Sequence, residues 1–235
     1  MQEVEFLEWD SKFFGYKIGK LECSLDFNSE FNCKKDYDLV YLFSPSLIQE
    51  YKDYLVDQKC VLRFNCLGES IEALKFNENI VVESFDFNKH SYESLLELVF
   101  ESGVQSRFKT DSKFSNEHFK SLYKKWIDNS LNKDIAIDTI VALEGEKIVG
   151  FLTYGEESYD TAKITLTAVD SSARGKKVAS SLINEFKKRI NVLGYTKANV
   201  VTQFDNLAAM RLYQKNGFNI SKITYIYHIW NNDTI

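Results

Sequence analysis

The second half of the chain alternates between strand-like and helix-like patterns of apolar residues. Two apolar runs, Ile137–Leu143 and Lys147–Tyr154, flank a short turn that contains a glycine, which is typical of a β-hairpin. Further strands are predicted at Lys163–Val169 and Tyr195–Thr202, and a closing strand at Phe218–Trp230. The predicted sheet therefore begins with an antiparallel pair and gains strands that are separated by longer connections.

Two amphipathic helices occupy those longer connections. From Val178 to Leu193 the apolar residues recur at helical spacing, with polar and charged residues on the opposite face. A second helix is predicted from Asp205 to Asn216, and Gly217 follows at a position where helices commonly end. The order of elements is hairpin, strand, helix, strand, helix, strand.

The first half is also a mixture of short strands and helices. Strands are predicted at Asp38–Phe43, Val61–Asn65 and Ile80–Ser84, and helices at Ser46–Asp57 and His90–Ser102. No internal repeat or low-complexity segment interrupts this half. The pattern indicates a small α/β domain without indicating a function.

A polar stretch, Ser102–Asp111, separates the two halves, and Gly103 is predicted to terminate the preceding helix. We therefore predict an N-terminal domain over residues 1–104 and a second domain over residues 105–235. Ser115 is expected to open the next helix, with His118 at the third position beyond it, so that the capping box is a loose one. His90 and His118 stand alone, so a structural role is favoured over catalysis.

Composition limits the classes of partner. The chain has 235 residues, of which 44% are hydrophobic, and a formal net charge of −5, which argues against nucleic-acid binding by phosphate attraction. The cysteines form no C-x-x-C pair and have no histidine nearby, so reduced thiols and no metal site are predicted: Cys23, Cys33, Cys60 and Cys66. The N-terminus does not resemble a signal peptide and no apolar run is long enough for a membrane span, so a cytoplasmic protein is predicted.

The segment from Lys163 to Ala179 combines a strand, a polar turn and the start of a helix. The first backbone N–H groups of a helix have no partner within it, and the helix dipole is positive at that end. Arg174, Lys176 and Lys177 add positive charge at the same place. This chemistry suits a pyrophosphate. The alternative is a helix start that binds nothing, beside a solvated cluster of charges.

Two motifs in this half resemble those of the GCN5-related N-acetyltransferase family. The first, R-x-x-G-x-G/A, stands here as Arg174, Gly175, Lys176, Lys177, Val178 and Ala179. The second stands as Asn206, Tyr213 and the run Lys215-Asn216-Gly217-Phe218. The resemblance implies an α/β fold with a central, mixed, splayed β-sheet flanked by helices, plus a smaller N-terminal α/β domain.

The resemblance also implies a mechanism and its site residues. Acetyl-CoA would lie between the strands that end near Val169 and Gln203, with Ala168 and Val169 pairing with the pantetheine arm. The first motif would hold the pyrophosphate through its N–H groups, Asn206 would contribute to the cofactor site, and Tyr213 would protonate the leaving thiolate. Lys177 departs from the motif because glycine is usual there; a lysine can serve if its φ is negative and its side chain points outward or onto a phosphate.

The first half resembles acetyltransferases of the dTDP-fucosamine type, through Trp9-Asp10-Ser11, Phe13-Phe14-Gly15 and Ser106-Arg107-Phe108. That resemblance implies a nucleotide-linked amino-dideoxyhexose as substrate and a place in surface polysaccharide biosynthesis. The substrate-binding candidates are Trp9, Asp10, Phe14 and Arg107. On aromatic content alone, a small hydrophobic core is favoured over a platform that stacks on a base or sugar, because aromatic residues are mostly buried. Asp10, Glu83 and Glu144 are candidates for the general base, and a water relay would need none of them.

Other functions fit the same motifs. The amine could belong to a polyamine, a protein N-terminus or an antibiotic, or the chain could be a non-catalytic acetyl-CoA sensor. The strand-rich C-terminus could pair across a homodimer. No nucleic acid, membrane or metal is expected as a partner.

Overall fold

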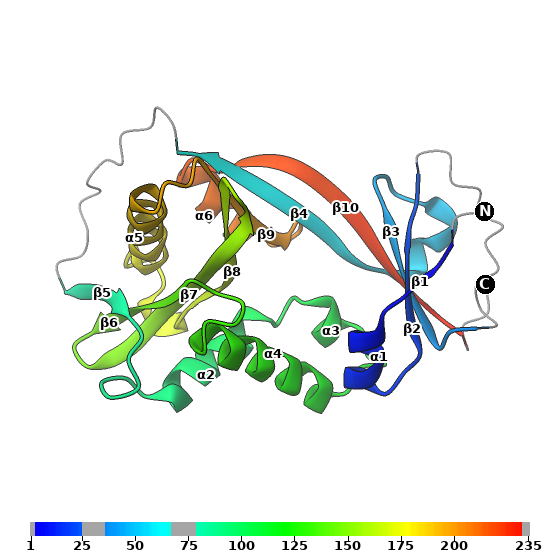
Figure 1. The fold of residues 1–235 in the computed structure, drawn as a ribbon, viewed down its shortest axis with the longest axis horizontal. Coiled ribbons are helices and arrows are strands. Elements are labelled where there is room, and N and C mark those ends of the chain that lie inside the picture. The colour runs from blue at the N-terminus through cyan, green and yellow to red at the C-terminus, as the bar shows by residue number, and fades with distance from the viewer. Residues whose placement is uncertain (1–2, 25–35, 67–78, 232–235) are drawn as a thin grey trace. The chain divides into compact units, whose positions relative to one another are not determined.

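The computed structural model describes residues 3–24, 36–66 and 79–231 (Figure 1). Internal contacts divide the chain into a first unit, residues 1–60, 203–205 and 222–235, and a second unit, residues 61–202 and 206–221. The division after residue 104 stays a prediction, because contacts do not test which part folds alone. Cys33 lies outside the described residues.

Over its described residues, the first unit is a small sheet with an α-helix, a short 3-10 helix and a compact apolar core. Its elements include β1 (Glu5–Phe6), α1 (Glu8–Phe14), β2 (Ile18–Glu22) and β3 (Leu39–Ser44). β2 is antiparallel to β1 and parallel to β3. β3 pairs with Tyr225–Trp230 of β10 (Asn219–Trp230), so an edge of the C-terminal strand is occupied by its own chain. The core contains Leu21, Val40, Leu42, Tyr51, Tyr227 and Ile229.

The helix predicted over Ser46–Asp57 is wrong in most of its length. The segment forms a short 3-10 helix, η1 (Gln49–Tyr54), and then enters β4 (Leu55–Asn65). The backbone N–H of Phe204 donates to the carbonyl of Gln58 at 2.8 Å, so this segment pairs with residues far along the chain. Tertiary pairing thus overrides the local pattern, and the strand predicted at residues 61–65 is the end of a longer one.

The second unit is a mixed sheet with helices on both faces. Its elements, in order after β4, are β5 (Ile80–Ser84), α2 (Tyr92–Ser102), α3 (Arg107–Thr110), α4 (Asn116–Leu131), β6 (Asp138–Glu144), β7 (Lys147–Ser158), β8 (Thr161–Val169), η2 (Ser171–Ala173), α5 (Val178–Val192), β9 (Lys197–Gln203) and α6 (Leu207–Lys215). Its strand order is β4-β9-β8-β7-β6-β5. α5 packs against β6, β7 and β8, while α2 packs against β7 and β8 from the other side (Figure 1).

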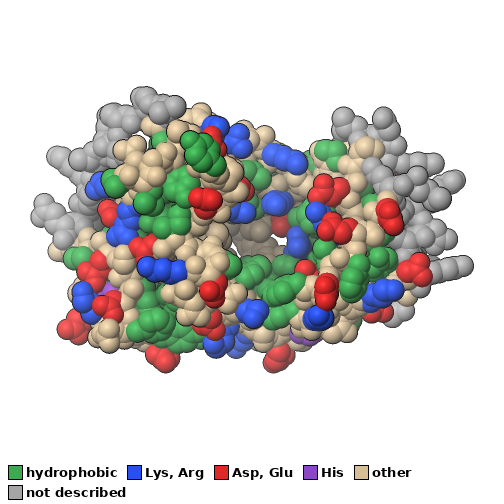
Figure 2. Space-filling view, in the orientation of Figure 1, with side chains coloured by type: hydrophobic (Ala, Val, Ile, Leu, Met, Phe, Trp, Pro, Cys, Tyr) green, Lys and Arg blue, Asp and Glu red, His purple; other side chains and the backbone are tan. Residues whose placement is uncertain are grey.

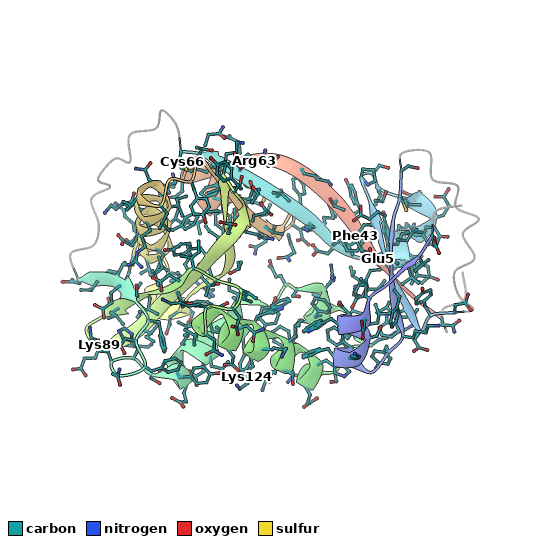
Figure 3. The ribbon with its side chains drawn as sticks, viewed as in Figure 1. Glu5, Phe43, Arg63, Cys66, Lys89 and Lys124 are labelled. Atoms are coloured by element: carbon teal, nitrogen blue, oxygen red, sulfur yellow. The ribbon has the colours of Figure 1, made fainter. Side chains whose placement is uncertain are left out.

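One pair of strands in this sheet separates part of the way along. β5 to β8 are antiparallel neighbours, whereas β8 and β9 are parallel and pair only at Thr161–Ile164 with Lys197–Val200. Beyond Ile164, β8 keeps its pairing with β7 but has no partner on the β9 side among the described strands. On the other edge of β9, Arg63 of β4 donates from Nε to Oδ1 of Asn199 at 3.0 Å (Figure 3 labels Arg63).

The two isolated histidines both serve local structure. His118 completes a capping box at the start of α4: its N–H donates to Ser115 Oγ (3.1 Å) and its Nδ1 accepts from the Ser115 N–H (3.4 Å). The imidazole therefore replaces the usual Glu or Gln. His90 accepts from the Asp86 N–H at 2.9 Å, and its Nε2 lies 3.1 Å from Glu83 Oε1. These contacts support the structural role that we predicted.

Charged side chains of both signs are interspersed over the visible face of the molecule (Figure 2). This face has no continuous strip of basic side chains that would suit a nucleic-acid phosphate backbone. The net charge of −5 agrees with this distribution. Among the helices of the described residues, none is both long enough and apolar enough to cross a bilayer.

Gly103 is required for packing rather than for a left-handed turn. It follows the last residue of α2, as predicted, but its φ is −101°, which any residue adopts. A Cβ added there would lie 2.4 Å from Tyr123 Cζ and 2.7 Å from Phe119 Cε2 on α4. The glycine therefore lets the end of α2 approach two aromatic rings of α4.

We predict that Gly103→Ala lowers the free energy of unfolding by about 1–3 kcal/mol, because the added methyl group overpacks this contact. Urea denaturation of the purified protein measures the effect. Glu97→Ala, an exposed change on the same helix, is the control and should stay within about 0.5 kcal/mol of the wild type. Equal stabilities of the two variants would show that the rings move aside at no cost.

Candidate active site

A cavity of about 390 Å³ lies where β8 extends past its pairing with β9. Its walls come from the end of β8, the end of α2, the turn before α5 and the start and inner face of α6. Six residues that the sequence analysis assigned to the active site line it: Ala168, Val169, Arg174, Ala179, Asn206 and Tyr213. Residues from the two sequence motifs, which lie about 30 positions apart, are thus brought to one place.

Tyr213 is the most deeply buried polar group of this cavity. It lies on α6 and is only 3% exposed, and its hydroxyl has no hydrogen-bond partner among the described residues. Desolvation raises the pKa of Tyr213 above its ordinary value, so the phenol stays protonated at neutral pH. The side chain is therefore placed to donate a proton or a hydrogen bond into the cavity.

The Arg174–Ala179 loop presents several free donors. The N–H groups of Arg174 and Lys176 make long bonds to the carbonyls of Ser171 (3.4 Å) and Ala173 (3.3 Å). By contrast, the N–H groups of Gly175, Lys177, Val178 and Ala179 have no acceptor within the part of the chain that the structure describes, and no side chain caps α5. The loop and the first turn of α5 can therefore bind an anion through the backbone.

Lys177 adopts the conformation that glycine would adopt at this position of the motif. Its φ is +66°, so the condition of a negative φ that we set for a lysine at this position is not met. Among the described non-glycine residues, only Lys133 shares a positive φ. The left-handed region costs an L-residue about 1–2 kcal/mol. The backbone therefore has the left-handed conformation that suits glycine, although the residue is lysine, and this conformation strains the backbone.

Lys177→Gly should raise the free energy of unfolding by about 0.5–1 kcal/mol, because the relieved strain exceeds the extra unfolded-state entropy of glycine. Chemical denaturation measures this difference. Lys177→Ala removes the same side chain without relieving the left-handed strain, and should leave stability close to that of the wild type. Equal stabilities of the two variants would mean that φ at this position carries no strain.

Ion pairs hold the loop to the β6–β7 hairpin. Lys176 Nζ lies 2.7 and 2.9 Å from the carboxylate oxygens of Glu144. Asp170 accepts from Lys147 Nζ (2.7 Å) and the Ser172 N–H (2.8 Å), and these bonds hold its pKa well below the usual range. Val178 is 1% exposed and belongs to the core. Lys176 and Val178 can therefore contribute to a ligand site mainly through the backbone.

Glu101 is a cavity-lining carboxylate that the sequence analysis missed. It occupies the last turn of α2, and its Oε2 lies 3.9 Å from Arg174 Nη2. Asn206, at the opposite wall, caps α6 by accepting from the Ala209 N–H at 3.1 Å. In the sequence, Glu101 is distinguished only by its position at the end of a predicted helix, next to the polar stretch Ser102–Asp111. That position does not reveal which residues the Glu101 side chain faces.

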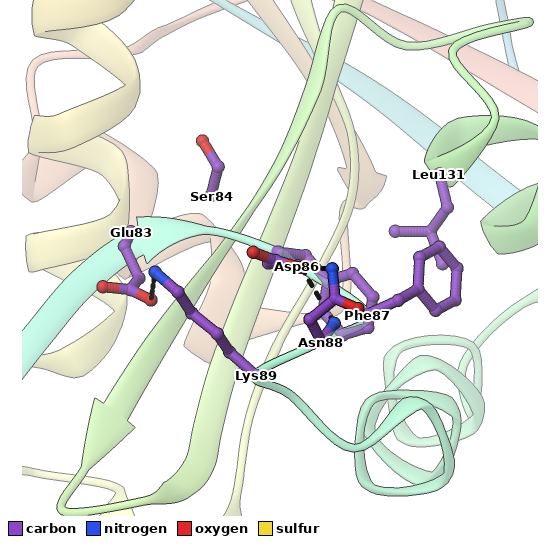
Figure 4. A pocket seen from close by; sticks show the side chains of 8 residues that line it. Glu83, Ser84, Asp86, Phe87, Asn88, Lys89 and Leu131 are labelled. Carbon is purple, nitrogen blue, oxygen red and sulfur yellow. Dashed lines mark hydrogen bonds and ion pairs between the residues drawn. The ribbon is translucent and has the colours of Figure 1, made fainter.

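The carboxylates that were considered as general base are engaged elsewhere. Glu83 lies beside a different hollow, where its carboxylate is within 3.1 Å of His90 and 4.0 Å of Lys89 (Figure 4). Glu144 pairs with Lys176. Neither residue lines the Tyr213 cavity. Asp10 lies in the first unit, on α1.

The substrate-binding candidates have mixed environments. In the first unit, Trp9 is 46% exposed and stacks on Phe13 at 4.9 Å, whereas Phe14 is 3% exposed. The burial of Phe14 favours the alternative in which this ring belongs to a small core. In the second unit, Arg107 lies over the ring of Phe108, with Cζ 4.7 Å from its centroid, and does not line the Tyr213 cavity.

These features define a protein with a splayed mixed sheet and a turn with unpaired backbone N–H groups beside a buried tyrosine. Residues 92–218, more than half of the chain, match the Acetyltransferase (GNAT) family. The chain therefore belongs to the GNAT acetyltransferase family. The family and the fold class predicted from the sequence are confirmed.

Two relatives and one solved structure illustrate the range of similarity. The chain is 29% identical over 138 residues to the spore coat polysaccharide biosynthesis protein SpsD of Bacillus subtilis, covering 59% of this chain and 47% of that protein. It is 32% identical over 104 residues to a mycothiol acetyltransferase of Brachybacterium faecium, covering 43% and 29% respectively. The chain spans less than half the length of these relatives.

The solved structure extends the likeness of fold beyond the matched segment. A GCN5-related N-acetyltransferase of Sphaerobacter thermophilus superimposes with a TM-score of 0.55 at 17% identity. The alignment covers 84% of this chain and 61% of that protein. At this identity the likeness concerns the fold alone.

Proposed function

We propose that the chain transfers the acetyl group of acetyl-CoA to the amine of a small molecule. The observation that carries this proposal is the Tyr213 side chain, only 3% exposed, in a cavity that Arg174 and the end of β8 also line. Family membership supports it, because both sequence motifs contribute to the same cavity. When bound, acetyl-CoA supplies the thioester carbon that the amine attacks.

Each part of the cavity has a separate task in this proposal. The backbone of Ala168 and Val169 pairs with the pantetheine amides, since β8 has no partner there on its β9 side among the described strands. The free N–H groups of the Arg174–Ala179 loop hold the pyrophosphate, and the Arg174 side chain adds a charge. As the new C–N bond forms and the C–S bond breaks, Tyr213 gives its phenolic proton to the departing sulfur, and the proton that the amine nitrogen loses passes through solvent and restores the phenol.

Burial of Tyr213 is compatible with proton donation despite its raised pKa. A phenol titrates ordinarily near pH 10 and a thiol near 8.5, so transfer to a thiolate in water would be uphill. Desolvation disfavours a thiolate in the same cavity just as it disfavours a phenolate. Because desolvation raises both pKa values, the raised pKa of Tyr213 does not by itself widen the mismatch with the thiol, and the donor stays protonated at neutral pH.

Tyr213→Phe should lower kcat by about 10²–10⁴-fold, the usual range for loss of a general acid. The KM for acetyl-CoA should change little, because the ring that packs in the cavity wall remains. Steady-state kinetics with a thiol-detecting assay measures both. Tyr159→Phe is the matched control, since Tyr159 is 96% exposed. An unaltered kcat in Tyr213→Phe would remove the tyrosine from the mechanism.

For the acceptor, we propose the amino group of a nucleotide-linked amino-dideoxyhexose, with dTDP as the favoured nucleotide. The support is the sequence resemblance of the first half and the similarity to a protein named for spore coat polysaccharide biosynthesis. The similarity to a mycothiol acetyltransferase keeps another small amine as the alternative. Polyamine, protein N-terminal and antibiotic acceptors, or a sensor without turnover, are further alternatives. Tyr213 favours turnover over sensing.

Thermal-shift measurements with acetyl-CoA, coenzyme A, dTDP and UDP separate these proposals. A ligand present at 100 times its Kd stabilises the folded state by about 2.7 kcal/mol. We expect a rise in Tm with acetyl-CoA and coenzyme A that is reduced in Arg174→Ala, and a further rise with dTDP. A shift with coenzyme A alone would favour another amine, and no shift with coenzyme A would contradict acetyl transfer itself.

A cytoplasmic location and a homodimer remain part of the proposal. The pairing of β10 with β3 leaves less of the C-terminal strand for contact with a second copy than we expected from the sequence.

A further inference from the structure

Lys187 on α5 places its charge against the end of α6, the helix that carries Tyr213. Its Nζ donates to the backbone carbonyl of Asn216 at 2.7 Å. The same Nζ lies 3.6 Å from the centroid of the Phe64 ring and 5.8 Å from that of Phe218. Phe64 neighbours Arg63 near the end of β4 (Figure 3). Lys187 does not line the Tyr213 cavity, so any effect on it passes through other residues.

Asn216 links the two helices at this point. It is the C-terminal cap of α6, and its Nδ2 donates to the Leu212 carbonyl (2.8 Å) and to Ser180 Oγ on α5 (3.3 Å). A helix end carries partial negative charge on its last carbonyls, so an ammonium group there is stabilising. The cation also lies over an aromatic face, which is favourable when it is partly desolvated. Lys187, on α5, therefore stabilises the packing of the last turn of α6 against α5.

Tyr213 directly contacts the residues with which Lys187 interacts at this end of α6. Its backbone carbonyl accepts from the N–H groups of Asn216 and Phe218, both at 3.0 Å. Its ring packs edge-on against Phe218, with centroids 5.7 Å apart, and Phe218 in turn packs against Phe64 at 5.5 Å. Lys187 thus contacts both the helix end and the aromatic rings that fix where the tyrosine points.

We propose that Lys187 is a positioning residue for acetyl transfer, one that holds the hydroxyl of Tyr213 at the leaving sulfur. The inference rests on the proposed function, in which Tyr213 donates the proton. It assigns to Lys187 no contact with substrate. Loss of Lys187 should therefore lower kcat only in proteins that retain the hydroxyl of Tyr213.

A double-mutant cycle tests this consequence. Lys187→Met keeps the length of the side chain and removes the charge; we expect kcat to fall about 10- to 100-fold, as for a small misplacement of a reacting group, with KM for acetyl-CoA within about threefold. In a Tyr213→Phe background the same change should have almost no further effect on kcat. Lys187→Arg should recover most of the activity. Lys188→Met, at the neighbouring exposed lysine, is the matched control.

The assay uses acetyl-CoA with a dTDP-linked 4-amino sugar, and acetyl-CoA hydrolysis alone if that acceptor is not used. If Lys187→Met lowers kcat equally in the wild-type and Tyr213→Phe backgrounds, the positioning role is overturned, because a general loss of structure would lower kcat in both. If Lys187→Met does not fold, Lys187→Gln, which keeps a donor for the Asn216 carbonyl, takes its place in the cycle. A wild type that does not bind acetyl-CoA in calorimetry would contradict the proposed function instead.

Discussion

The limited pairing of β8 with β9 is the constraint on which the candidate site depends. The two parallel strands share a ladder only over Thr161–Ile164, and β8 continues to Val169 with one edge unpaired. Buried backbone groups need partners, so such an edge must be met by solvent or by a ligand. The cavity forms along this edge, and the chain enters the anion-binding loop directly after it. A ladder continued to Val169 would fill the space that the ligand is proposed to occupy.

The loop keeps a strained conformation because several contacts on its two sides determine its path. Asp170 fixes the turn that precedes it, the Lys176–Glu144 pair ties its centre to the hairpin, and Val178 is buried in the core behind it. With both ends fixed, Lys177 adopts a left-handed conformation although it has a side chain. Strain of this size persists where surrounding contacts over-determine the backbone, which is common at functional sites.

Local sequence patterns predicted the strands and helices of the second half of the chain well, and those of the first half less well. The strands and helices from residue 137 onward follow from the spacing of apolar residues, and the two motifs located Arg174 and Tyr213. β4 was mistaken for a helix in its first turn because its pairing partner lies far along the chain. Glu101 and Lys187 were missed for the same reason: what each residue faces is set by packing, not by its neighbours in sequence.

The pairing of Arg174 with Glu101 bears on how the proposed cavity would accept a diphosphate. The two groups are 3.9 Å apart with side chains 68% and 48% exposed, and such exposed pairs are worth about 0–1 kcal/mol. Charge-assisted hydrogen bonds from backbone N–H groups to an anion are roughly twice as strong as neutral ones. The four free N–H groups of the loop therefore outweigh the ion pair. Glu101 can orient the guanidinium before binding without excluding a phosphate afterwards.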